Sequence, residues 1–158
     1  NQIIWFKVSK FYTKADFENA IKEIDRLYSH ATNSIKKKFN VYKASSALML
    51  NDDNTFLDTI KLINKNSRTY GPYYYYYLLA YLLMHDEYNR AEEIYGILTN
   101  DLNTGREFDL VTPLAILLAH KGDSKAYKKL RDLKRNNHID ATFMNVANKF
   151  IRENKRND

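Results

Sequence analysis

The sequence predicts an all-α protein. Only 4 glycines and 2 prolines occur among 158 residues, whereas a β-rich fold of this length needs more turn residues. Apolar residues recur along most of the chain at the three- and four-residue spacing of helices. In addition, one short pattern recurs at intervals of about 35 residues. We therefore expect a stack of helices formed by internal repetition.

The helices are predicted to end where Asn, Asp, Ser and Gly gather, because these residues cap helices and turn the backbone. Such breaks fall at 13–14, 29–33, 51–53, 64–71, 85–86, 100–108, 121–122 and 136–138. About nine helices result. Pro72 and Pro113 are each expected within a first helical turn, where a missing N–H has no cost.

The recurring pattern is a small or acidic residue, then an aromatic two residues on, then an alanine three residues later. It is clearest at 15–20 and 86–91, is one residue shorter at 121–126 and is looser at 52–57. Its last positions, Ala20, Leu57, Ala91 and Ala126, are 37, 34 and 35 residues apart. A small side chain at this position lets the second helix of a pair lie close against the first. Leu57 is large and departs from this pattern.

A period near 34 with a tight turn, an aromatic residue and then an alanine resembles the tetratricopeptide repeat. The resemblance implies one domain over 1–158, built as a right-handed superhelical stack of about four antiparallel helix pairs. The units would be 2–32, 33–68, 71–104 and 108–137. A capping helix at 139–154 would cover the last face with Ile139, Phe143, Val146, Phe150 and Ile151.

In such a stack the first helix of each pair lines a concave surface. Counting back from Ala91, the residues on it would be Tyr73, Tyr76, Tyr77, Ala80 and Met84, with Phe39, Tyr42, Lys43 and Ser46 from the preceding unit. Tyr75, Leu78, Leu79 and Leu82 would pack inward. Tyrosine offers a large rigid surface with one polar tip, so this surface favours a protein- or peptide-binding scaffold. Two alternatives to partner binding remain. The exposed tyrosines pack against the second unit, or they meet the tyrosines of another copy of the chain in a homo-oligomer.

The charge of +6 lies at one end of the chain, because residues 121–158 carry 11 Lys/Arg against 5 Asp/Glu while the rest is balanced. The predicted basic patch comprises Lys121, Lys125, Lys128, Lys129, Arg131, Lys134 and Arg135. Such a patch suits nucleic acid, an acidic protein face or a membrane surface, and it also fits a merely solvated helix. With the 35-residue spacing from Ala91 to Ala126, it leaves RNA binding of the pentatricopeptide kind as the alternative function.

No motif for catalysis, metal binding or cofactor binding is present in the sequence: it has no cysteine, no glycine-rich phosphate loop and no paired-histidine zinc helix. His85 and His120 lie at equivalent places one repeat apart. The longest apolar stretch, 73–84, is too short to span a bilayer. We therefore expect a non-enzymatic domain in a reducing, cytoplasmic compartment, the alternative being an activity carried by a flanking domain. Because Asn1 and not methionine comes first, we expect a fragment of a longer protein.

Overall fold

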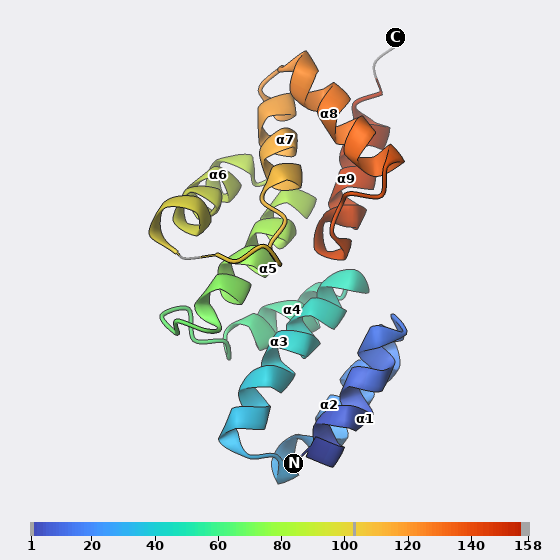
Figure 1. Cartoon of the computed structure of the whole chain (residues 1–158), viewed down its shortest axis with the longest axis vertical. Helices are drawn as coiled ribbons and strands as arrows, with labels where there is room; N and C mark the ends of the chain where they lie inside the picture. The colour runs from blue at the N-terminus through green and yellow to red at the C-terminus, as the bar shows by residue number, and fades with distance from the viewer. Residues whose placement is uncertain (1, 103, 156–158) are drawn as a thin grey trace. The chain divides into compact units, whose positions relative to one another are not determined.

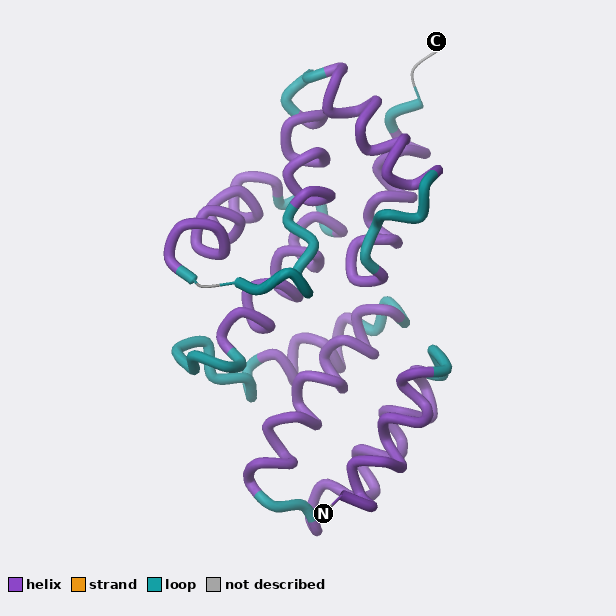
Figure 2. Tube along the Cα trace, viewed as in Figure 1, coloured by secondary structure: helices purple, strands orange, loops and turns teal. Residues whose placement is uncertain are grey.

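The computed structural model describes residues 2–102 and 104–155, and the regular structure of these residues is entirely helical (Figures 1 and 2). The nine α-helices in this part of the chain are α1 (Gln2–Thr13), α2 (Phe17–Leu27), α3 (Asn33–Met49), α4 (Asp53–Ile60), α5 (Gly71–Met84), α6 (Tyr88–Gly96), α7 (Val111–His120), α8 (Ser124–Arg135) and α9 (Ala141–Glu153). The predicted all-α class is confirmed. Pro72 and Pro113 both lie in first helical turns, as predicted.

The starts of the helices follow from their capping residues. Asp16, Asp52, Asp123 and Asp140 each accept a hydrogen bond from a backbone N–H of the first turn that follows, and Thr32 does the same for α3. A helix leaves its first N–H groups without intrahelical partners, and these side chains satisfy some of them. Most of the predicted breaks therefore fall within a residue or two of the observed ones.

The turns within the four expected helix pairs share one geometry. Ala15, Asn51, Asp86 and Gly122 all have a positive φ, and their spacings are 36, 35 and 36 residues. In each turn the next N–H donates to a carbonyl five residues back: Asp16 to Phe11, Asp52 to Ala47, Glu87 to Leu82 and Asp123 to Leu118. This left-handed residue with its long hydrogen bond is a common helix terminus. The even spacing of these four turns is compatible with a helical repeat, although the same geometry occurs once more at Asn137, only 15 residues after Gly122.

The same turns correct the register of the predicted repeat. The residues whose N–H donates back to the capping residue are Ala20, Phe56, Ala91 and Tyr127, so these four are structurally equivalent. Leu57 and Ala126 were therefore each aligned one residue away from the true position. Phe56 is buried and Leu57 is 37% exposed. A small residue at this position recurs only at Ala20 and Ala91, so close helix approach through alanine is not a property of every pair.

The chain divides into two compact units, Asn1–Tyr77 and Leu78–Asp158, and the division falls within α5. In the first unit α1 packs on α2, α2 on α3 and α3 on α4. Its core includes Val8, Ile24, Leu27, Ile35 and Phe39. These residues come from the first three helices, so burial of apolar surface holds those helices together.

In the second unit α7 packs against α8, and α9 contacts both of them. Ile139, Phe143, Val146 and Phe150 are buried and Ile151 is half-buried. The Lys149 ammonium on α9 donates to the Met84 carbonyl at 3.0 Å and to an Asp86 carboxylate oxygen at 2.8 Å. These bonds tie α9 to the turn between α5 and α6.

No helix in residues 2–102 or 104–155 combines the length and the apolar character that a membrane span requires.

Candidate functional site

Four tyrosines of the first unit form a cluster with Ser45, in which Tyr77 is buried and Tyr12, Tyr42 and Tyr73 are half-buried. The Tyr12 hydroxyl and the Ser45 hydroxyl are 2.8 Å apart, and the Tyr12 and Tyr42 rings meet edge to face at 4.5 Å. Tyr77 packs beside Tyr73, with ring centroids 6.1 Å apart. The cluster thus joins side chains from α1, α3 and the first half of α5. We call these five residues the tyrosine cluster.

Burial changes the chemistry of this cluster. It is the main reason why the pKa of the Tyr77 hydroxyl is raised above its ordinary value; Tyr12 raises it further, and a hydrogen bond with Ser45 opposes the rise. Burial likewise raises the pKa of Tyr42. A low-dielectric surrounding disfavours the phenolate, so these hydroxyls stay neutral and serve as hydrogen-bonding groups.

Several residues predicted to line the concave surface are buried and do not present a surface. Tyr76 and Tyr77 are 3% and 6% exposed. Phe39, Ser46 and Ala80 are buried as well. Their assignment to an open surface is corrected for a physical reason: α5 is apolar on every side, so its sequence does not indicate which face turns outward.

The remaining residues of the predicted concave surface keep partial exposure. Tyr42, Lys43, Tyr73 and Met84 are half-buried, and Lys43 forms an ion pair with Asp25 of α2 at 2.6 Å. Among the residues expected inside, Leu79 and Leu82 are buried, while Tyr75 and Leu78 are only half-buried. Partner binding through the half-buried residues stays a prediction.

The predicted basic patch separates into distinct parts on and near α8. Lys121 is held at 2.5 Å from a Glu92 carboxylate oxygen. Lys125, Lys128, Arg131 and Arg135 line one pocket together with Ser124, Tyr127 and Asp132, whereas Lys125 and Lys129 lie on a second one. Lys134 is exposed and lines neither of these two. Basic residues that are neighbours in the sequence therefore point to different sides of α8 and do not form a single patch.

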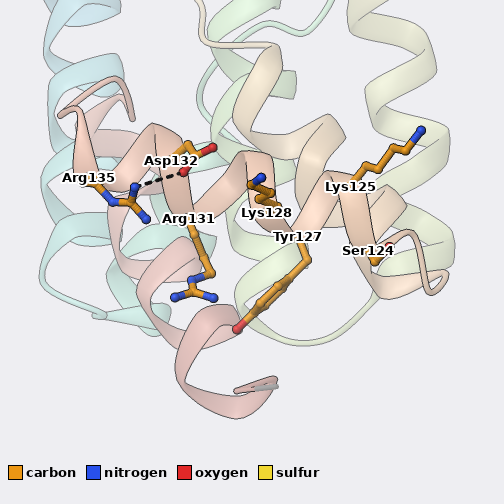
Figure 3. Close-up of a pocket in the computed structure, with 7 residues that line it drawn as sticks. All are labelled: Ser124, Lys125, Tyr127, Lys128, Arg131, Asp132 and Arg135. Carbon is orange, nitrogen blue, oxygen red and sulfur yellow. Dashed lines mark ion pairs between the residues drawn. The ribbon is translucent and has the colours of Figure 1, made fainter. Parts of the chain in front are cut away.

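The first of these, which we call the α8 pocket, has a volume of 490 Å³ and is lined only by α8 (Figure 3). Arg131 lies over the Tyr127 ring, 6.0 Å from its centroid. Arg135 pairs with Asp132 at 3.5 Å, so part of the positive charge is already neutralised. Tyr127 is only 5% exposed. This pocket can attract an anion, but its one aromatic ring is not available for stacking.

The second depression, which we call the α7–α8 groove, has a volume of 430 Å³ and is mostly apolar. Its lining residues are Tyr95 of α6, Leu110, Val111, Leu114, Ala115 and Leu118 of α7 and its start, and Asp123, Lys125, Ala126 and Lys129 at α8. Val111, Leu114 and Leu118 are 47%, 39% and 38% exposed. Large apolar side chains that share one exposed face commonly mark a binding surface.

The local structure fixes this groove. Asp109 caps α7, because its carboxylate accepts from the N–H groups of Val111 and Thr112 and from the Thr112 hydroxyl. The Tyr95 hydroxyl donates to the Leu110 carbonyl at 3.0 Å. The same Asp109 accepts from the N–H of Asp140 at 3.1 Å. The start of α7 is thus anchored to α6 and to the approach to α9, so its apolar face is held in place.

Helical periodicity then aligns the exposed residues. Val111, Leu114 and Leu118 stand at positions i, i+3 and i+7, which share one face of a helix. Val111, Leu114 and Leu118 are not among the residues predicted from the sequence to bind a partner. One feature of the sequence could have indicated them. α7 is apolar at nearly every position beyond Thr112, and neighbouring helices rarely cover all sides of a helix.

The histidines have separate surroundings. The His120 ring stacks on Tyr88 with centroids 3.6 Å apart, and His85 lies against Tyr81 at 4.4 Å. Within the described residues no group of three or more His, Asp or Glu side chains is arranged to hold a metal ion.

Burial, with a contribution from Asp86, raises the pKa of the Tyr88 hydroxyl to about 12.

Comparison of the chain with models of protein families, with curated protein sequences and with solved structures finds no match.

Proposed function

We propose that this chain is a helical-repeat domain of the tetratricopeptide-like kind, and that it binds a partner protein through the α7–α8 groove. The observation that carries the proposal is the row formed by Val111, Leu114 and Leu118, three large apolar side chains exposed on one helix face. The free energy gained by covering them can drive association, at about 25 cal/mol per Å² of apolar surface. A cytoplasmic location accords with the lack of cysteine.

The equally spaced turns support the repeat architecture. Repeat proteins commonly bind partners on faces formed by several helices, and the groove is formed by α6, α7 and α8. The groove also holds a small number of polar groups among apolar ones, which is the usual composition of a specific binding site. This assignment moves the proposed binding surface from the tyrosines of α5 to α7.

The proposal is tested by loss of partner capture. The double variant Leu114→Asp with Leu118→Asp places two carboxylates in the groove at positions that are 39% and 38% exposed, and its helical circular dichroism checks that it is folded. Leu57→Asp is the matched control, because Leu57 lies on α4 in the first unit and its 37% exposure matches that of the two groove leucines. Proteins captured from a native extract by the wild-type chain and by the control variant are expected to be lost from the groove variant. Equal capture by all three proteins would remove the groove from consideration.

A second candidate function is binding of single-stranded RNA along α8. The specific observation in its favour is the alignment of Lys125, Lys128, Arg131 and Arg135 along one pocket of a single helix. The burial of Tyr127 disfavours it, because sequence-tolerant binding of single strands usually needs exposed rings on which bases stack.

The test for this candidate is an electrophoretic shift of a labelled uridine-rich RNA over a salt series, with the wild-type chain and the variant Lys128→Glu. Binding that weakens steeply with salt and is reduced at least 5-fold by the variant would support RNA as the ligand. No shift at low salt would exclude this candidate.

A further inference from the structure

We infer that the α7–α8 groove takes an amphipathic α-helix of a partner protein, and that this helix carries acidic residues along the flank that faces α8. The inference rests on the proposed function and specifies the partner. It depends on three features of the groove: its backbone, its length and its charge.

A helical partner follows from the backbone of the groove. An extended peptide binds most readily by adding a strand to an exposed sheet edge, and residues 2–102 and 104–155 contain no strand. The backbone N–H groups of α7 and α8 are used within the helices or by the capping residues Asp109 and Asp123. Side chains must therefore make most of the contact, and an amphipathic helix supplies a row of them.

The length of the exposed row sets the size of the partner segment. From Val111 to Leu118 is seven residues, or roughly 10 Å along a helix at about 1.5 Å per residue. A partner helix matching this row places apolar residues at three positions, i, i+3 or i+4, and i+7. Tyr95, Ala115 and Ala126 also line the groove, and the two alanines are buried. The short alanine side chains leave room for the partner's apolar side chains.

Charge complementarity sets the flank. Lys125 and Lys129 lie one turn apart on α8 beside the groove, and in Figure 3 the Lys125 side chain extends away from Arg131 and Arg135. Within the described part of the chain neither ammonium lies at ion-pair distance from a carboxylate. The one carboxylate at the groove, Asp123, already accepts from the N–H groups of Lys125 and Ala126 at 3.0 and 3.2 Å. The groove therefore presents a positive edge along α8.

Three fluorescent synthetic peptides of about 16 residues, long enough for four helical turns, test the inference by anisotropy. One has leucines at i, i+3 and i+7 with glutamates along one flank, and the second has lysines in place of the glutamates. The third contains the residues of the first in an order that spreads the leucines around the helix. At low salt the acidic peptide is expected to bind at least 10-fold more tightly than either of the others.

A charge reversal sharpens the test. The double variant Lys125→Glu with Lys129→Glu is expected to prefer the lysine peptide over the glutamate peptide. The matched control is Lys128→Glu, which makes the same change on the exposed side of α8 that lines the α8 pocket, and it should leave the preference of the wild-type chain intact. The helical circular dichroism of each variant checks that it is folded.

The inference is overturned if the sign of the peptide flank has no effect, if the spread-out peptide binds equally well, or if the Lys128 variant alters the preference as strongly as the double variant. It is also overturned if light scattering shows a concentration-dependent dimer that Leu114→Asp abolishes, since the occupant is then a second copy. If no peptide binds while the leucine variants still lose captured proteins, the inference fails and the proposed function stands. If capture is unaffected by the leucine variants, the proposed function fails as well.

Discussion

Tyr77 is the side chain whose replacement best distinguishes a core role from a surface role for the tyrosine cluster. It is 6% exposed, lies beside Tyr73 and Tyr76, and shares a hydrogen bond with Ser45. Tyr77→Ala removes a buried aromatic ring, and such changes cost about 3–5 kcal/mol of unfolding free energy. Tyr77→Phe keeps the ring and is expected to cost about 1 kcal/mol, the value of one hydrogen bond.

Urea denaturation of the two variants measures these costs. A Tyr77→Ala protein as stable as the wild type would show that this ring is not part of the core, and would return Tyr77 to the set of candidate surface residues.

The ion pair between Lys149 and Asp86 predicts a pH dependence of stability. Its hydrogen bond from Lys149 is the main reason why the pKa of Asp86 lies below its ordinary 3.8. A carboxylate with a lowered folded-state pKa stabilises the fold above its ordinary pKa, and that contribution is lost as the pH falls through the lowered value.

Lys149→Met removes this contribution. The stability difference between wild type and variant, measured by denaturation from pH 7 down to pH 2, is expected to be largest near neutrality and to shrink below about pH 4. The bond to the Met84 carbonyl contributes a part that does not vary with pH. A difference that stays constant over this range would show that Asp86 titrates in the same way in both proteins.

The helix pairs differ in how closely their two helices can approach. The corrected register therefore predicts different stability effects for substitutions at Ala91 and at Leu57. Ala91 is fully buried at the equivalent position of the third pair, so Ala91→Leu forces extra methylene groups into a packed interior and is expected to cost about 1–3 kcal/mol. Leu57→Ala is the contrasting change, because Leu57 is 37% exposed, and it is expected to cost under about 1 kcal/mol.

Thermal unfolding followed by circular dichroism compares the two variants. If Leu57→Ala were the more harmful change, the register based on the four turns would be wrong and the original alignment of Leu57 with Ala91 would be right.

The individual helices were the most predictable features of this chain. Asp16, Asp52 and Asp123 precede apolar helical patterns, and their capping chemistry is local, so the sequence indicates where those helices begin. Pro72 and Pro113 gave correct starts for the same reason. The register of the repeat was less accessible, because a one-residue slip at Leu57 or Ala126 preserves nearly the same spacing while changing which side chain is buried.

The faces of the most apolar helices could not be assigned from sequence. Tyr76 and Tyr77 were expected to lie outward by counting from Ala91, but α5 has no polar side and its contacts decide the matter. In α7, similarly, nothing in the order of residues separates the exposed Leu114 and Leu118 from the buried Ile116 and Leu117. Periodicity assigns a face only where polar and apolar residues alternate around the helix.

The whole chain comprises two compact helical units, and the proposed binding groove lies in the second. Among the basic residues of α8, Lys129 borders the groove, Lys128, Arg131 and Arg135 line the α8 pocket, and Lys125 lies at both. Mutation of Lys129 should act on partner choice, whereas mutations of Lys128, Arg131 and Arg135 should act on binding of anions. Charge at long range mainly changes association rates and their salt dependence.

The most direct measurement is site-specific photo-crosslinking from the groove itself. A photoreactive phenylalanine analogue is placed at Leu114 in one protein and at Leu57, which is exposed to a similar extent, in another, and each is irradiated in a native extract. We expect a discrete crosslinked product from position 114 that is absent from position 57 and is suppressed by an excess of the acidic amphipathic peptide. The same products from both positions, or none from position 114, would contradict it.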